Sequence, residues 1–424
     1  MTQHTPYEEL EKRFRDIALI GEAASVLHWD LSVVMPKGGS AARGEQMAAL
    51  HVLKHNMLTD PAIETLLADA EEMQSSLNDW QKANIREMKR EYVHATAVPS
   101  DLVEAHSKAC SSCESVWRIA KTDSDFDAVL PNLQHVLDLT KEMGQAKSEK
   151  LGVDLYDALL DQFEPDGRAA DIEPIFNDYA AFLPEFLGQV IEKQNSEADL
   201  PPLRGKYETS KQRDLTHRFA QAVGFDFDAG RLDESAHPFS TGHRGDQRIT
   251  VRYEDDEFAQ GLMAVLHECG HAMYEKQLPA DWALQPVGQS RGMAIHESQS
   301  LIVEMQACRS REFYDFAAPI IRDLFLEENP NNASAYSAEN LHRHAIHVKP
   351  DFIRVDADEV TYPAHVILRF RIEKALLEGH MSLKDLPAAW NDGMQDLLGI
   401  TPPNHAMGCM QDIHWYDGAW GYFP

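Results

Sequence analysis

The sequence predicts a mostly α-helical protein that carries one small β element. Through long segments before residue 195, apolar residues recur three and four positions apart, which is the period of an amphipathic helix. The clearest alternation of apolar and polar residues is DQRITVRY at 246–253, which is the period of a strand. Beyond this strand the helical period returns and continues.

The first half of the chain is expected to be a stack of helices. The helical period is clearest at 7–29, 60–95 and 172–194. Short runs that contain proline or glycine separate the helical stretches, at Pro36 to Gly39, Pro99, Pro131 and Pro165 to Gly167. Two prolines and a glycine then interrupt the period at 199–213. We therefore expect one domain over 1–424 with two lobes, a helical one at about 1–200 and a second one at about 201–424.

The strand at 246–253 is expected to precede the most informative helix. Asp255 and Asp256 suit the N-terminus of this helix, because carboxylates cap the free N–H groups there and favour the positive end of the helix dipole. The helical period then continues to Pro279. Two further long helical stretches are expected downstream, at 291–325 and 359–379.

The composition argues against several classes of partner. The chain has 39 Lys and Arg against 69 Asp and Glu, a net charge of −30, which repels nucleic acid and anionic membrane surfaces. No apolar run approaches the roughly 18 to 20 residues of a membrane span. Five scattered cysteines, an odd number that includes Cys110 and Cys113, indicate reduced thiols. We expect a cytoplasmic protein that binds neither nucleic acid nor membrane.

The motif HECGH at 267–271 places two histidines four residues apart on the expected helix. Side chains at i and i+4 project from one face about 6 Å apart, so both imidazoles can reach one Zn²⁺ at about 2.0–2.1 Å. Glu268 lies beside them and is suited to take a proton from water activated by the metal. The alternative is a solvated polar face, because HExxH occurs by chance in many long proteins.

The position of the histidines around the helix favours the metal. An apolar stripe on the same helix is expected to face a core; it consists of Phe258, Leu262, Val265, Cys269 and Met273. At about 100° per residue, His267 and His271 point away from this stripe. A catalytic site also needs a third ligand, and Glu297 in HESQS is the candidate, 26 residues after His271 on the next expected helix.

Four further motifs lie on either side of HECGH and HESQS. They are HPF at 237–239, DQRIT at 246–250, IRVDAD at 353–358 and GCMQDIHW at 408–415. Together with HECGH and HESQS they resemble the M32 metallocarboxypeptidases, the carboxypeptidase Taq family. This resemblance implies a helical, cleft-bearing fold similar to the neurolysin-like peptidases. It also implies a homodimer, and removal of single C-terminal amino acids from peptides with a free carboxylate.

The resemblance also implies roles for individual residues. His267, His271 and Glu297 bind one divalent metal and Glu268 is the general base. The family's metal is usually zinc or cobalt; zinc is our first choice and cobalt the second.

A carboxypeptidase must recognise a free carboxylate, and the planar fork of arginine suits this task. Arg354 in IRVDAD is the first candidate and Arg248 in DQRIT the second. The alternative for either is an ion pair with nearby Asp246, Asp356 or Asp358. The strand that carries Arg248 is also suited to pair with an extended substrate backbone.

Three other residues are candidates for contact with the substrate. His237 and His414 can donate a hydrogen bond to a developing oxyanion, and each has the alternative of a satisfied buried histidine. The family pattern continues past WGYFP with more helix and a tyrosine, so we expect a short or truncated member in which Tyr422 is the remaining donor. This leaves two alternatives: an oligoendopeptidase with the same HExxH motif, or a catalytically impaired, metal-stabilised helical binding protein.

Overall fold

The computed structural model describes residues 5–423, and these form fifteen α-helices and one three-stranded sheet. The mostly α-helical fold with a small β element is thereby confirmed. The chain divides into two compact units. Unit 1 consists of Met1–Ala95 and Leu200–Ala345, and unit 2 consists of Thr96–Asp199 and Ile346–Pro424.

These units differ from lobes separated at residue 200. The chain does pass from one unit to the other at the expected boundary, but each unit also takes a segment from the other side of it. Periodicity along the chain shows where helices form and carries no information on which distant segments pack together.

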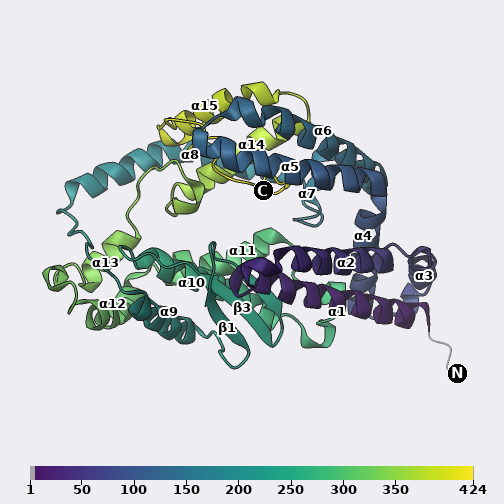
Figure 1. Cartoon of the computed structure of the whole chain (residues 1–424), viewed down its shortest axis with the longest axis horizontal. Coiled ribbons are helices and arrows are strands. Elements are labelled where there is room, and N and C mark those ends of the chain that lie inside the picture. The colour runs from purple at the N-terminus through teal and green to yellow at the C-terminus, as the bar shows by residue number, and fades with distance from the viewer. Residues whose placement is uncertain (1–4, 424) are drawn as a thin grey trace. The chain divides into compact units, whose positions relative to one another are not determined.

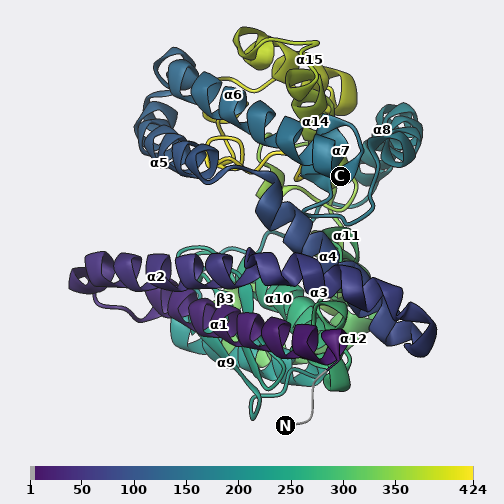
Figure 2. The same ribbon diagram turned by 90° about the vertical axis from the view of Figure 1, so that its right-hand side faces the viewer.

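Unit 1 contains the N-terminal helices, the sheet and the helices that follow it. Its helices are α1 (Pro6–Val33), α2 (Ser40–Leu58), α3 (Pro61–Glu72), α4 (Asp79–Ala97, whose last two residues fall in unit 2), α9 (Thr209–Val223), α10 (Ala259–Gln277), α11 (Met293–Leu301), α12 (Arg311–Phe325) and α13 (Ala338–Ala345). In Figures 1 and 2, α1 and α2 lie side by side. A capping box at Thr5 and Glu8 begins α1, because the two residues satisfy each other's backbone N–H groups.

The sheet has the strand order β1-β3-β2. Strand β1 (Gly230–Glu234) pairs in parallel with β3 (Asp246–Val251), and β2 (Ser240–His243) pairs with β3 antiparallel. The predicted strand is therefore the middle one, and both of its edges are occupied. The expectation that this strand pairs with a substrate backbone is wrong for this reason.

Helix α10 is enclosed by two apolar clusters. Val265 and Cys269 pack with Ile249 and Val251 of β3, whereas Leu262 packs with α9 and α12. The buried stripe predicted for this helix is confirmed for all its members except Met273, which is partly buried. His267 and His271 are left on the remaining face.

Unit 2 contains the other helices and the C-terminal segment. Its helices are α5 (Ser100–Asp123), α6 (Phe126–Leu151), α7 (Leu155–Leu160), α8 (Ala169–Ser196), α14 (Tyr362–Leu377) and α15 (Leu386–Leu398). Helices α5 and α6 lie side by side in both views (Figures 1 and 2). Their apolar faces join those of α14, α15 and the segment after α15 in one core.

Several element boundaries differ from the expected ones. Pro131 lies inside α6 and not between helices, and the stretch 291–325 is divided by a π-helical turn at Ile302–Ala307. The N-cap residue of α10 is Phe258, and the carboxylate that meets the first N–H groups of the helix is that of Glu257, not of the two aspartates before it. This carboxylate accepts hydrogen bonds from the backbone N–H groups of Ala259 at 2.7 Å and Gln260 at 2.6 Å.

Two further features concern the cysteines and the apolar character of the helices. All five cysteines are free and buried. Among the described residues, no helix combines the length and the apolar character that crossing a bilayer requires.

Candidate metal centre and active site

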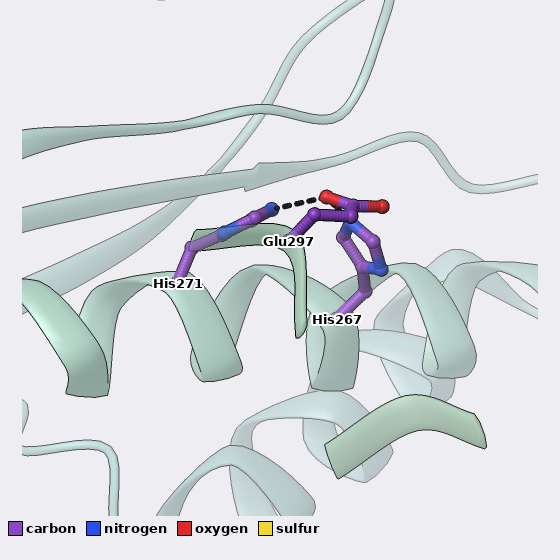
Figure 3. A group of neighbouring side chains, drawn as sticks. All are labelled: His267, His271 and Glu297. Atoms are coloured by element: carbon purple, nitrogen blue, oxygen red, sulfur yellow. Dashed lines mark ion pairs between the residues drawn. The ribbon is translucent and has the colours of Figure 1, made fainter. Parts of the chain in front are cut away.

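The candidate metal centre is formed by two antiparallel helices of unit 1. On α11, His296 contacts Glu275 and His271 of α10. The next residue, Glu297, contacts His271 and His267, which come earlier in α10, so the two helices run in opposite directions. Figure 3 shows the two histidines rising from the same face of α10 and the Glu297 carboxylate between their rings. The structure therefore brings together the three residues predicted as ligands.

The distances in this group suit a small cation. The Glu297 Oε2 atom lies 3.3 Å from Nε2 of His271 and 3.7 Å from Nε2 of His267. One ligand atom from each residue lies within 4.8 Å of the others. In a tetrahedral zinc site with bonds of about 2.0–2.1 Å, neighbouring ligand atoms are separated by about 3.4 Å. Two imidazoles and one carboxylate, with one position left open, are also the donors of many catalytic zinc sites.

The pKa values of Glu297 and His267 depend on their neighbours. Burial alone would raise the pKa of Glu297, but the hydrogen bond with His271 and the proximity of His267 leave this pKa below its ordinary value. Burial lowers the pKa of His267, and the hydrogen bond with Glu304 and the charge of Glu297 outweigh it, so the net shift is upward. The site thus concentrates negative charge around the histidines, which favours a cation.

Glu268 is the predicted general base and lies on the buried side of the same helical turn, only 6% exposed. Burial raises the pKa of Glu268 to about 7, against an opposing effect of His267. A divalent cation nearby would lower it again, because a positive charge favours the carboxylate.

Each predicted histidine ligand has a second partner that sequence reasoning did not identify. Nδ1 of His267 lies 3.0 Å from Oε2 of Glu304, and Nδ1 of His271 lies 2.7 Å from Nδ1 of His296. The signal for Glu304 was present in the sequence. It follows Glu297 by seven residues, and on a regular α-helix this spacing, about two turns, would place both carboxylates on one face.

Arg354, the first candidate for carboxylate recognition, lies in unit 2 within a buried group of charges. Its Nε atom lies 3.1 Å and its Nη2 atom 3.3 Å from the two carboxylate oxygens of Asp412. This carboxylate is 58 residues from Arg354 in the sequence and was not among the expected alternatives. Arg369 binds the same carboxylate, with Nε 2.7 Å from Oδ2.

This group carries an excess positive charge. Burial alone would raise the pKa of Asp412, but Arg369 and Arg354 hold it well below its ordinary value, so one carboxylate faces two guanidinium groups. Nearby His414 does not add charge, because burial lowers its pKa to about 4. A second anion would therefore be stabilised here. The Asp412 and Arg369 positions were not predicted, although Asp412 lies within the GCMQDIHW motif.

Two of the predicted substrate residues contact each other in unit 2. The rings of His414 and Tyr422 are stacked with centroids 4.8 Å apart. Nδ1 of His414 is buried and has no hydrogen-bond partner among the described residues. His414 is therefore not a buried histidine whose two ring nitrogens are both hydrogen-bonded, which was the alternative considered for it.

Arg248 and His237 lie in unit 1 and have different surroundings. Arg248 makes a two-atom ion pair with Asp246, at 2.9 and 2.8 Å, and its guanidinium lies 4.4 Å from the ring centroid of Trp29. This is the structural ion pair weighed as its alternative. His237 is exposed in the connection between β1 and β2.

The whole chain is similar to known proteins. The sequence profile of the carboxypeptidase Taq (M32) metallopeptidases matches residues 9–424. The thermostable carboxypeptidase 1 of Thermus thermophilus is 37% identical over 435 residues, covering 100% of this chain and 84% of that protein. Carboxypeptidase 1 of Bacillus subtilis is 35% identical over 431 residues, covering 100% of this chain and 83% of that protein.

Solved structures give the same result. Metallocarboxypeptidase 1 of Trypanosoma cruzi superimposes with a TM-score of 0.95 at 38% identity, covering 99% of this chain and 83% of that chain. A carboxypeptidase of Pyrococcus furiosus gives 0.93 at 35% identity, covering 100% and 84%. Since the profile and these relatives span nearly the whole sequence, the chain belongs to the carboxypeptidase Taq (M32) family of metallopeptidases and is a metal-dependent carboxypeptidase.

Proposed function

We propose that the chain hydrolyses the last peptide bond of peptides with a free C-terminal carboxylate, with His267, His271 and Glu297 holding one divalent metal and Glu268 acting as general base. The observation that carries this proposal is the convergence of three ligand atoms from two helices within 4.8 Å. The substrate class follows from the names of the relatives, which are carboxypeptidases.

The metal proposed for the site is zinc, with cobalt as the second choice. Nitrogen ligands suit both ions, whereas magnesium and calcium prefer sites made of oxygen atoms alone. When bound, such an ion polarises the scissile carbonyl and lowers the pKa of water. His267, His271 and Glu297 would supply three of the four ligands of a catalytic zinc site, and water or substrate would supply the fourth.

Glu268 is proposed to take the proton from the attacking water and to deliver it to the leaving amine. Its place next to His267 in the chain puts its carboxylate beside the ligands without making it one of them. Because it is buried, its carboxylate has little competition from bulk water for this proton.

Arg354 is proposed to bind the free carboxylate of the substrate. The excess positive charge that it shares with Arg369 and Asp412 supports this role, because Asp412 cannot neutralise two guanidinium groups. Arg248 is the second candidate, and its ion pair with Asp246 makes it weaker. His237, His414 and Tyr422 remain candidates for contact with the substrate. His414 is the strongest of the three, because its Nδ1 has no hydrogen-bond partner among the described residues.

The remaining proposals concern the protein's assembly and location. A homodimer is proposed from the resemblance to the family, and a cytoplasmic location from the five free cysteines. Nucleic acid and membranes are not proposed as partners, because the net charge is −30.

Two matched peptides test the proposed function. One has a free C-terminus and the other, of the same sequence, has a C-terminal amide. The zinc-loaded chain should remove single residues from the free peptide, as followed by mass spectrometry, and should lose most activity on the amide. Equal cleavage of both peptides at internal bonds would instead favour the oligoendopeptidase. Zinc binding without turnover of either peptide would favour the impaired binding protein.

A further inference from the structure

One carboxylate beside the proposed metal ligands has no role in the function described so far. Glu304 lies in the π-helical turn Ile302–Ala307 that follows α11, and its side chain is 12% exposed. Its Oε2 atom lies 3.0 Å from Nδ1 of His267. Its Oε1 atom accepts a hydrogen bond from Nη2 of Arg309 at 2.8 Å.

Arg309 contacts the carboxylate oxygen of Glu304 that does not contact His267. Its side chain is 14% exposed, and its Nη1 atom also donates to the backbone carbonyl of Ala345 at 3.4 Å. Both carboxylate oxygens of Glu304 are therefore committed, one to each neighbour.

The two ring nitrogens of a histidine cannot both be metal ligands for one ion. Nε2 of His267 points to Glu297, at 3.7 Å from Oε2, so this is the nitrogen that faces the metal position. Its lone pair must then be free, and the proton of the neutral ring belongs on Nδ1. Glu304 is an acceptor at that nitrogen and cannot act as a donor while it is ionised.

We propose that Glu304, held by Arg309, is the positioning residue of His267: it keeps the imidazole in the Nδ1–H form and fixes the direction of its Nε2 lone pair. This inference rests on the proposed ligand set. Such carboxylate–histidine pairs orient the ring and increase the basicity of the ligating nitrogen.

The two histidines are not supported equally. Nδ1 of His271 meets the imidazole of His296, and Nε2 of His296 lies 2.9 Å from Glu275. His271 therefore faces a ring nitrogen, whereas His267 faces a carboxylate directly. For this reason we expect metal affinity to depend more on Glu304 than on Glu275.

The test measures the zinc affinity of purified full-length variants by competition with a chromophoric chelator. Glu304→Gln keeps the size and one acceptor oxygen but loses the charge, and Glu304→Asp keeps the charge but is too short to reach His267. Both should bind zinc about 10- to 100-fold more weakly than the wild type. Glu275→Gln should lose less, and exposed Glu312→Gln on α12 is the control that should not change.

A second measurement separates positioning from folding. Thermal melting of the metal-free variants should stay close to that of the metal-free wild type for Glu304→Gln. If that variant unfolds, Arg309→Lys, which keeps a cation but cannot hold Glu304 and the Ala345 carbonyl with two nitrogens of one planar group, should still weaken zinc binding. Zinc affinities of both Glu304 variants within threefold of the wild type would overturn the inference. Loss in Glu304→Gln with full affinity in Glu304→Asp would also overturn it, because the effect would then be one of charge alone.

The ligand set itself is tested in parallel with Glu297→Gln. If the wild type binds no zinc, or if Glu297→Gln binds it as well as the wild type does, the proposed metal centre fails. If Glu297→Gln loses zinc while the Glu304 variants keep it, only the positioning role fails.

Discussion

Gly270 lies directly against the backbone of Ser300, where α10 and α11 are in contact. A Cβ atom at Gly270 would come within 2.5 Å of both the Ser300 Cα and the Gln299 carbonyl oxygen. Ser300 is also tied to the proposed ligand, because its hydroxyl donates to the backbone carbonyl of Glu297 at 2.6 Å. Because Gly270 has no side chain, α11 can approach the two histidines of α10 this closely.

Gly270→Ala should weaken metal binding without removing any ligand. Backbone atoms of Gln299 and Ser300 cannot rotate away as a side chain can, so α11 must shift and carry Glu297 with it. We expect zinc affinity to fall about 10-fold or more, and the free energy of unfolding to fall by about 1–3 kcal/mol, as for other overpacked contacts. Chelator competition and chemical denaturation measure the two effects.

Gly188→Ala is the matched control for this change. Gly188 lies in α8, and a Cβ atom there meets no atom within 4 Å. Its substitution should leave zinc affinity unchanged and raise stability by up to about 1 kcal/mol, since alanine favours a helix more than glycine does. Equal zinc affinities for the two alanine variants would show that the α10 to α11 spacing is not critical.

Glu268→Gln should keep the metal and lose hydrolysis. The amide has the same shape but cannot take a proton from water, and removal of a general base typically costs about 10²- to 10⁴-fold in rate. The measurements are zinc content and kcat/KM on a peptide with a free C-terminus. Retained activity would remove Glu268 from this role, and loss of zinc would mean that it helps to hold the site.

The grouping of the three proposed ligands could be expected from the sequence because it depends on short-range geometry. The spacing of His267 and His271 and their position relative to the apolar stripe of α10 follow from the helical repeat alone. Glu297 needed only a loop and a returning helix. The sequence shows a glycine at position 270. Only the structure shows why it matters, because backbone atoms of α11 occupy the space that a side chain there would need.

The surroundings of Arg354 were not predictable in the same way. Its partner Asp412 is 58 residues away, and nearer carboxylates were the expected alternatives. Sequence distance does not rank candidates for an ion pair once the chain has folded into two units, each made of segments distant in the sequence. The three-stranded sheet is a similar case, because only its middle strand has a clear alternation and the flanking strands are four and five residues long.

Buried Glu373 should make stability depend on pH. It is 0% exposed and accepts hydrogen bonds from Tyr156 at 3.0 Å and Trp415 at 2.9 Å, as well as from the backbone N–H groups of Gly421 and Tyr422. Burial raises its pKa to about 7, although these four donors oppose the shift.

The sign of the pH effect follows from this raised pKa. Folded Glu373 keeps its proton at pH values where the unfolded chain has released it, so its contribution to stability is complete below the ordinary pKa near 4.5 and is lost as the pH rises to about 7. The free energy of unfolding of the wild type minus that of Glu373→Gln should therefore fall by about 2–3 kcal/mol between pH 5 and pH 8. Denaturation at several pH values measures it, with exposed Glu192→Gln as control; a difference that is constant with pH would contradict the raised pKa.

Arg354→Lys and Arg248→Lys should separate the two candidates for carboxylate recognition. Lysine keeps the charge but cannot make the two-point contact of a guanidinium. If Arg354 binds the substrate's carboxylate, Arg354→Lys should reduce kcat/KM on a free peptide by about 10- to 100-fold, the value of one charge-assisted hydrogen bond. On the matching amide the same variant should lose much less, because the carboxylate is absent there.

Arg248→Lys should instead affect stability, since Arg248 is already engaged by Asp246 and lies over the ring of Trp29. Its kcat/KM should change by a similar factor on the free and the amidated peptide, with a lower midpoint of denaturation. The ratio of activity on the two peptides is the deciding measurement, because a general loss of fold cancels in it. A ratio that falls for Arg248→Lys and not for Arg354→Lys would reverse the assignment.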